Sequence, residues 1–260
     1  KKWWEFWKKE QKTAPEKKEK PNLYLLNYDG DMAAAGVKNL REEVSALLQI
    51  AEEGDEVLLN LKSPGGVVNG YGLAASQLVR IREKGLHLTV AVDEVAASGG
   101  YLMACVANKI IAAPFAIVGS VGVVAQLPNF HKLLEKFNID YEQFTAGDYK
   151  RTVTMFGENT DEGREKFKSE IEEIHTIFKE FVHQYRPDLD IEMIATGEHW
   201  LAVRAKELGL VDELKTSDAY LLDSLKERNV FSIKYIEKKS VRKGFSRFLT
   251  KLANRLNIHY

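Results

Sequence analysis

The chain has a single cysteine, no long apolar run and almost no net charge, and each of these absences excludes a class of protein. Cys105 is the one cysteine among 260 residues, which excludes an internal disulfide framework and a metal site built from several cysteines. Lysine and arginine number 37 against 38 aspartate and glutamate residues, so no overall positive charge favours nucleic-acid binding. No run of about 18 apolar residues is present to form a membrane-spanning helix.

The charge that is present is divided unevenly along the chain. Residues 1–21 contain eight lysines and four glutamates, and residues 234–260 contain eight lysines and arginines and one glutamate. These two ends carry formal charges of +4 and +7, which leaves −12 on residues 22–233. The sequence thus predicts an acidic body, long enough for a substantial core, between two basic ends.

Both ends have features of a membrane surface, and each has a simpler alternative. Residues 1–9, KKWWEFWKK, hold three of the four tryptophans, and indole rings beside lysines suit a membrane–water interface or else a solvated tail with a few apolar anchors. Residues 10–21 have the composition of a charged linker. In residues 237–260 an apolar stripe opposes a basic face, which is typical of a helix lying on an anionic membrane or packing on a neighbouring subunit.

Between these ends, strand and helix patterns alternate. Short apolar runs at 23–28, 56–62, 86–92 and 109–113 predict strands, and apolar residues at helical spacing predict helices over 37–52, 69–83 and 99–107. A long charged helix with an apolar stripe is predicted over 162–185. This alternation predicts an α/β fold, with a parallel β-sheet flanked by helices.

Three turns rich in glycine are candidates for the functional site. The turn Ser63-Pro64-Gly65-Gly66 follows a predicted strand, and its glycine amides could stabilise an oxyanion, unless it is an ordinary strand–helix turn. Ser98, in Ala96-Ala97-Ser98-Gly99-Gly100-Tyr101, stands where a strand leads into a helix, which suits either a nucleophile or a helix cap. The third turn, residues 118–123, contains Ser120.

A nucleophilic serine needs a base, and the histidines offer no recognisable triad. His199 is the best histidine candidate, and His175 and His183, on the long helix, are predicted to face solvent. Lys150, which follows a glycine turn, is the alternative, because burial can lower the pKa of a lysine amine enough for it to act as a base. Composition alone favours the simpler interpretation of Lys150 as a solvated surface charge. Cys105 is predicted to be a core residue rather than a nucleophile.

The turns at 63–66, 96–101 and 118–123, followed by a lysine 52 residues after Ser98, together resemble the signal peptide peptidase A family of serine proteases, peptidase family S49. Residues 70–78, 105–130, 145–152, 157–167 and 195–200 extend the resemblance to one branch of that family. It implies a ClpP/crotonase-like fold and a serine endopeptidase with a Ser–Lys dyad. In that resemblance Ser98 is the nucleophile, Lys150 the general base, and Ser120 orients the lysine.

The same resemblance assigns the oxyanion hole to Gly65, Gly66 and Gly99, with the amides of Gly66 and Gly99 as donors and Gly65 holding the turn. No cofactor and no metal are expected with it, and the balanced charge predicts no nucleic-acid partner. Residues 22–236 are then the peptidase domain, between the tail with its linker (1–21) and the C-terminal helix (237–260).

The family also sets expectations for assembly and location. Its double-length members place the serine and the lysine in different halves of one chain, so this chain is expected to form a homo-oligomer whose subunits share sites. We expect it at the bacterial inner membrane, anchored by a segment that precedes residue 1, with signal-peptide remnants or unfolded peptides as substrates. A non-catalytic oligomeric membrane scaffold and a crotonase-type acyl-CoA enzyme are the alternatives.

Overall fold

The structure is a computed structural model that describes residues 20–237. The predicted end segments, 1–21 and 237–260, lie almost entirely outside the described residues. The body is built on a parallel sheet whose strands follow the order β8-β5-β3-β2-β1-β9. These strands are β1 (Asn22–Asp29), β2 (Glu56–Lys62), β3 (His87–Val92), β5 (Lys109–Ala112), β8 (Glu213–Leu214) and β9 (Asn229–Ser232).

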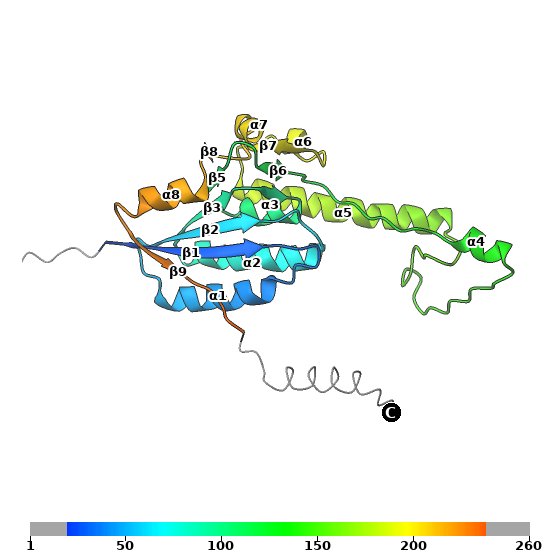
Figure 1. Ribbon diagram of the computed structural model, residues 1–260. Helices are drawn as coiled ribbons and strands as arrows, with labels where there is room; N and C mark the ends of the chain where they lie inside the picture. Colours follow the sequence, from blue (N-terminus) through cyan, green and yellow to red (C-terminus); the bar gives the residue numbers. More distant parts are fainter. Residues whose placement is uncertain (1–19, 238–260) are drawn as a thin grey trace, which may run out of the picture.

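Helices cover both faces of this sheet (Figure 1). On one face α1 (Val37–Ile50), α2 (Val68–Glu83) and α3 (Gly99–Ala104) enclose the main core together with alternate residues of β1 and β2. On the other face α8 (Ser217–Ser224) covers a smaller core around Leu58 and Ile111. Burial on both faces explains why the strands are nearly continuous apolar runs. The predicted α/β architecture is confirmed.

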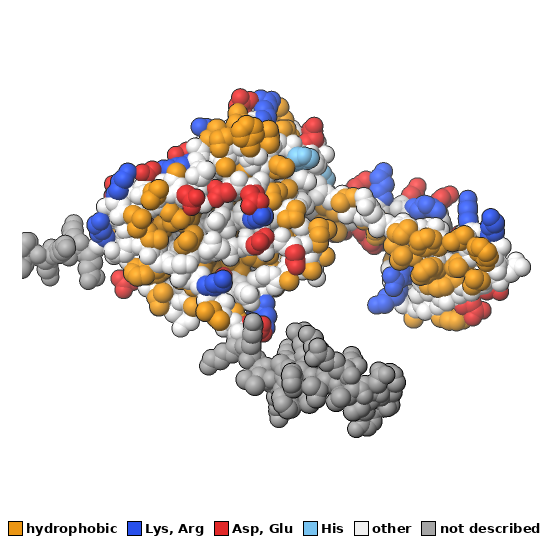
Figure 2. Space-filling model, in the orientation of Figure 1, with side chains coloured by type: hydrophobic (Ala, Val, Ile, Leu, Met, Phe, Trp, Pro, Cys, Tyr) orange, Lys and Arg blue, Asp and Glu red, His pale blue; other side chains and the backbone are white. Residues whose placement is uncertain are grey.

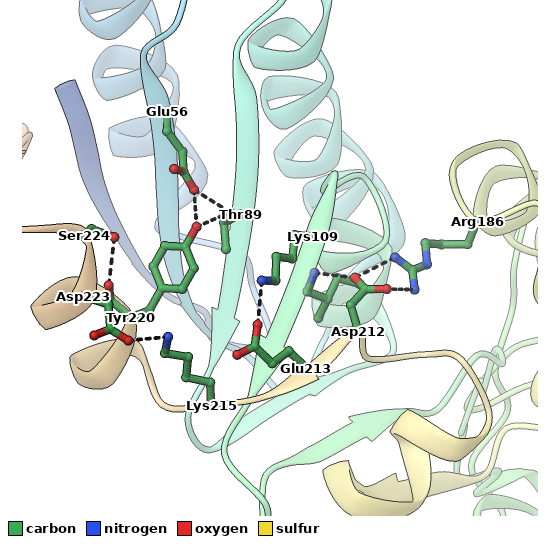
Figure 3. Close-up of polar contacts among 11 residues, drawn as sticks. Glu56, Thr89, Lys109, Arg186, Asp212, Glu213, Lys215, Tyr220, Asp223 and Ser224 are labelled. Carbon is green, nitrogen blue, oxygen red and sulfur yellow. Dashed lines mark hydrogen bonds and ion pairs between the residues drawn. The ribbon is translucent and has the colours of Figure 1, made fainter. Parts of the chain in front are cut away.

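Paired polar groups fix α8 and the neighbouring loops to the sheet (Figure 3). The buried carboxylate of Glu56 accepts hydrogen bonds from the hydroxyls of Thr89 and Tyr220. Elsewhere Arg186 forms a two-pronged ion pair with Asp212, which also accepts the main-chain N–H of Ile110 in β5. A buried carboxylate such as that of Glu56 is tolerated only when it is paired. The contacts of Glu56 and of the more exposed Asp212 together attach the C-terminal part of the body to the sheet.

A second, smaller sheet stands at the end of the first. It has three strands in the order β4-β6-β7: β4 (Val95–Ala97), β6 (Ile117–Gly119) and β7 (His199–Leu201). A bridge between Ser63 and Ala96 joins it to the end of β2. Three-residue strands are too short to show a period of two, so the sequence pattern did not predict this sheet.

The predicted long helix is α5 (Asp161–Tyr185), and it begins where the side chain of Thr160 accepts the N–H of Gly163. Between β6 and α5 the chain runs beside α5, forms α4 (His131–Lys136), and returns (Figure 1). We call residues 125–160 the arm. The remaining helices are α6 (Ile191–Ile194) and α7 (Ala202–Glu207).

Helix α3 is shorter than predicted, because it ends at Ala104 instead of Ala107. The reason lies in Asn108, whose side chain accepts the N–H of Leu88 while its own N–H donates to the Leu88 carbonyl. These two bonds pull the chain out of the helix and into β5 beside β3. This contact joins residues twenty positions apart, so the helical spacing of apolar residues could not predict it.

Candidate active site

Ser98 lies at the sharp turn between β4 and α3. Its backbone has φ 53° and ψ −120°, a conformation that costs a non-glycine residue about 1–3 kcal/mol. Its N–H donates to the carbonyl of Gly119 at 2.8 Å. Although Ser98 occupies the N-cap position of α3, its hydroxyl makes no capping hydrogen bond. The helix-cap interpretation is therefore wrong, and the hydroxyl is available for other chemistry.

The turn after β2 lies directly against Ser98. Gly65 has φ +87°, and its N–H donates to the hydroxyl of Ser63 at 3.1 Å. In contrast, the N–H groups of Gly66 and Gly99 have no hydrogen-bond acceptor within residues 20–237. Since a free amide pair beside a serine is the usual form of an oxyanion hole, this arrangement matches the expected roles of the three glycines.

Ser98 opens into a cavity of about 920 Å³. Gly65, Gly66, Gly99 and Ser120 also line it, and its remaining wall is largely apolar, with Leu102 from α3 and Ile174, Phe178 and Phe181 from α5. This volume lies in the range of ligand-binding clefts, and its apolar wall suits the side chains of a bound peptide.

Ser120 reaches the cavity from the other side of Ser98. It follows Gly119, whose carbonyl accepts the Ser98 N–H, and its own N–H donates to the Glu198 carbonyl at 2.6 Å. Like Ser98, it has a positive φ, 55°. Two serines in strained backbone conformations thus line one cavity, and strain of this kind gathers at functional sites.

Lys150 lies away from this cavity. It is an exposed residue of the arm, and it is absent from the cavity wall. The ammonium of Lys166 lies 5.5 Å from the ring centroid of its neighbour Tyr149, which places this part of the arm beside the first half of α5. The α5 residues of the cavity begin at Ile174, about 12 Å further along the helix. Within one chain the structure does not bring Lys150 to Ser98.

Of the histidines, His183 and His199 are exposed, and neither lines the cavity. The prediction that His175 faces solvent is wrong. His175 is half-buried and lines the cavity, and its buried Nε2 atom has no hydrogen-bond partner among residues 20–237. His175 follows Ile174 on the helix and therefore lies at the edge of the predicted apolar stripe. At that position a small rotation of α5 about its axis determines whether the side chain faces solvent or the cavity.

Sequence reasoning missed Tyr71 near the site, and it missed the role of Ser63 within the first candidate turn. Ser63 and Tyr71 are both fully buried, and their hydroxyls lie 2.6 Å apart beneath the Gly65–Gly66 turn. The only available signal was a tyrosine at the start of the helix that follows the turn. Cys105, as predicted, is a core residue, and burial raises the pKa of its thiol well above the usual range. Such a thiol is inert at neutral pH.

Among residues 20–237, no cluster of three or more histidine, cysteine, aspartate or glutamate side chains is arranged to hold a metal ion. None of the helices in this part of the chain is both long and apolar enough to span a membrane.

Comparison with known proteins decides the family. The profile described as Peptidase family S49 matches residues 80–230, and the one described as Peptidase family S49 N-terminal matches residues 1–78. The chain belongs to peptidase family S49. The resemblance carried by the three glycine turns and the distant lysine is thereby confirmed, and membership of this family supports peptidase activity.

Two relatives place the chain within the family. Probable protease SohB of Haemophilus influenzae is 56% identical over 232 residues, which cover 89% of this chain and 66% of that protein. Probable protease SohB of Buchnera aphidicola subsp. Acyrthosiphon pisum is 53% identical over 234 residues, covering 90% and 70%. The chain therefore spans about two thirds of the length of these relatives. The branch of the family that the further stretches predict is the SohB branch, and this is confirmed.

Solved structures show the same fold. A membrane-bound stomatin-specific protease, studied as a lysine-to-alanine mutant in complex with a substrate peptide, has a TM-score of 0.51 at 14% identity. The match covers 88% of this chain and 98% of that chain. A serine-to-alanine mutant described under the same protease name gives 0.50. At this identity the likeness concerns the fold alone, and it confirms the predicted ClpP/crotonase-like fold.

Proposed function

We propose that the chain is a serine endopeptidase in which Ser98 is the nucleophile and Lys150 the general base. The observation that carries the proposal is the surroundings of Ser98. Its hydroxyl caps no helix, it opens into a largely apolar cavity, and the amides of Gly66 and Gly99 beside it have no acceptor in the described chain. These groups supply the nucleophile, the oxyanion donors and the substrate space that acyl transfer needs, and the base must come from outside the cavity of the single chain.

The chemistry follows from these groups. The Ser98 oxygen forms a bond to the peptide carbonyl carbon and passes its proton to a neutral lysine amine, while the carbonyl electron pair moves onto the oxygen. The amides of Gly66 and Gly99 stabilise that oxyanion. The C–N bond then breaks as the lysine returns the proton to the leaving amine. Water attacks the acyl-enzyme in the same way and restores Ser98. Ser120, on the cavity wall, orients the lysine amine.

We place Lys150 in the site of a neighbouring copy of the chain. A lysine amine surrounded by water stays protonated at neutral pH, and Lys150 is exposed. A neighbour that buried it against Ser98 would both deliver the base and lower its pKa. The arm itself supports assembly, because none of its side chains, residues 125–160, is buried. Ordering a segment of that length costs conformational entropy, and the segment has no core of its own to offset that cost. Packing against a neighbouring copy would offset it.

The surface of the arm also suits such a contact. Phe144 is 90% exposed, and Phe137 is 65% exposed. Further exposed apolar side chains, including Leu133, Ile139 and Tyr149, lie along the same segment. Figure 2 shows apolar atoms gathered on this end of the molecule. A monomeric protein rarely leaves such a patch in water, so the arm is suited to pack on another copy in a ring or dome.

The substrate and location that we propose are those expected of the family. An apolar cavity enclosed in a ring or dome of subunits would admit extended peptides, such as signal-peptide remnants or unfolded segments. Membrane association at the bacterial inner membrane is supported by the basic, tryptophan-rich residues 1–9 and by the solved protease of this fold, which is described as membrane-bound.

Labelling with a serine-reactive fluorophosphonate tests the proposal. The assembled wild-type protein should be labelled and should hydrolyse an unfolded peptide, and Ser98→Ala should lose both properties. Lys150→Ala should lose at least about 10³-fold in kcat/KM, because the two residues act as one unit. Ser169→Ala, which removes an exposed serine on α5 outside the cavity, is the control and should behave as wild type. Labelling that persists in Ser98→Ala would disprove the assignment, and an unlabelled wild type would favour a non-catalytic scaffold.

A further inference from the structure

A directed chain of hydrogen bonds runs beneath the Gly65–Gly66 turn. The N–H of Gly65 donates to Ser63 Oγ at 3.1 Å, the Ser63 hydroxyl donates to the Tyr71 phenol oxygen at 2.6 Å, and the Tyr71 hydroxyl donates to the Asp31 carbonyl at 2.8 Å. Each hydroxyl accepts once and donates once. Ser63 and Tyr71 are fully buried, so no water competes for these bonds. The turn is thereby connected to the loop after β1.

The ring of the same tyrosine touches the segment after Ser98. A Cβ atom on Gly99 would lie 2.4 Å from Cγ of Tyr71, so the ring and the Gly99 backbone are in direct contact. The backbone of Ser63 also contacts β4 directly before Ser98, because its carbonyl accepts the Ala97 N–H at 3.0 Å. One side chain from α2 therefore contacts both amide-bearing segments, Gly99 through its ring and the glycine turn through its hydroxyl.

Resting on the function proposed above, we propose that Tyr71 is a positioning residue that acts through Ser63. Its hydroxyl holds the Gly66 amide at the distance from the Gly99 amide that an oxyanion requires. Gly65 gives its N–H to this chain of bonds and is left with no donor for the substrate, whereas Gly66 and Gly99 keep theirs. The position of the Ser63 hydroxyl therefore determines that Gly65 holds the turn while Gly66 and Gly99 are the oxyanion donors.

The chemistry of the phenol suits a permanent link. Burial raises the pKa of Tyr71, so the hydroxyl remains protonated and keeps donating to Asp31 across the neutral range. A phenylalanine would preserve the ring contact with Gly99 and remove the hydroxyl alone. The positioning role is therefore separable from simple packing by a single oxygen atom.

The test compares Tyr71→Phe and Ser63→Ala with the wild type in the assembled protein. Because a displaced donor weakens only the transition state, kcat should fall about tenfold to a hundredfold while KM stays within about threefold. The double variant should be little worse than either single one, since both break the same chain of bonds. A peptide aldehyde, whose adduct with Ser98 places an oxyanion in the hole, should lose affinity in parallel. An unreactive peptide should bind Tyr71→Phe as it binds wild type.

Tyr28→Phe is the matched control. Tyr28 is almost as deeply buried, and its ring packs edge-on against Tyr71 with centroids 6.5 Å apart. Its hydroxyl, however, has no hydrogen-bond partner in the chain from residue 20 to residue 237. Removing that oxygen should leave kcat unchanged. Thermal unfolding of every variant checks that the fold persists.

Three outcomes would overturn the inference: wild-type kcat in Tyr71→Phe and Ser63→Ala, a rise of KM alone, or an equal loss of kcat in Tyr28→Phe. None of these outcomes would contradict the proposed function. The proposed function is contradicted by different results, namely an inactive wild type or a Ser98→Ala variant that keeps its activity.

Discussion

A Cβ atom on Gly65 would lie 2.8 Å from the Cβ of Ser98 and 2.8 Å from the main-chain nitrogen of Gly99. The turn after β2 and the turn before α3 therefore touch backbone to backbone, with no space for a side chain between them. The positive φ of Gly65, +87°, adds a second reason for glycine at this position. The relation between the nucleophile and the neighbouring amides depends on this contact.

Gly65→Ala should therefore reduce both activity and stability. The methyl group meets main-chain atoms, which cannot move aside as a flexible side chain would, so the two turns must separate. We expect kcat to fall by about 10²-fold or more and the free energy of unfolding to fall by about 1–3 kcal/mol. Peptide hydrolysis and urea denaturation measure the two effects.

Gly54→Ala provides the control for backbone strain. Gly54 has a similar φ, +91°, but a Cβ there would meet nothing within 4 Å. It should lose some stability from strain alone and keep the wild-type kcat. Activity within threefold of wild type in Gly65→Ala would show that the close contact is not needed for catalysis.

Mixed assemblies test the sharing of sites between chains. Ser98→Ala retains Lys150, and Lys150→Ala retains Ser98, so a contact between the two variants can rebuild one complete site. With random mixing in a head-to-tail ring, about a quarter of the sites should recover, and at most about half if the two variants alternate. The two variants are co-folded in equal amounts, and kcat per site is compared with that of the wild type.

The control for this experiment replaces Lys150→Ala with the double variant, which lacks Ser98 as well. That mixture contains no nucleophile and should stay inactive. If a proven mixed oligomer of the single variants shows no recovery, or if a verified monomer is fully active, then each site is built within one chain.

His175→Leu should make the protein more stable. Within the described part of the chain the buried Nε2 atom of His175 has no hydrogen-bond partner, and an unsatisfied buried polar atom costs about 1–3 kcal/mol. An apolar side chain removes that cost, so we expect the unfolding temperature to rise by a few degrees. Differential scanning calorimetry measures the shift. His183→Leu, eight residues along the same helix and exposed, should change little. A loss of stability in His175→Leu would mean that the imidazole is bonded after all.

The alkaline limit of stability should depend on Tyr220. Burial and the Glu56 carboxylate raise the pKa of this phenol to about 12, above its usual 10.0. In the folded chain the phenol thus keeps its proton at pH values where the unfolded chain has lost it. The resulting stability is fully present below about pH 10 and is lost as the pH rises through about 12.

Tyr220→Phe should accordingly flatten the fall in stability between pH 10 and pH 12, while lowering stability at neutral pH through the lost bond to Glu56. Denaturant unfolding at a series of pH values shows both effects, with the exposed Tyr141→Phe as the control. An unchanged slope above pH 10 would contradict the role of Tyr220.

The elements that the sequence predicted well are those whose pattern is local. The strand over 56–62 and the long helix over 162–185 match β2 and α5 within one residue, because buried runs and amphipathic stripes are written in neighbouring residues. The predicted end of α3 was wrong because Asn108 forms hydrogen bonds to Leu88 in β3, twenty residues earlier in the sequence. The small sheet was missed because its strands are held by partners far along the chain.

The candidate site shows the same division. Ser98 and the glycines stand in recognisable turns, and the structure brings all of them to one cavity. The link through Tyr71 and Ser63 depends on the packing of α2 beneath a turn, which residue spacing does not record. The spacing of 52 residues between Ser98 and Lys150 correctly indicated the family. It did not predict the distance between the two side chains in space, because the arm holds Lys150 away from the Ser98 of the same chain.

The pairing of β1 with both β2 and β9 has a consequence for how the chain is made. β1 emerges from the ribosome first among the described strands, yet one of its edges is completed only by residues 229–232, and the Asn229 N–H binds the Pro21 carbonyl. During synthesis that edge waits unpaired while some 200 residues are added, and an open strand edge can pair with another nascent chain. Contacts so distant in sequence also favour slow folding. Loss of β9 should therefore appear first as aggregation during expression, well before any effect on the catalytic groups is measured.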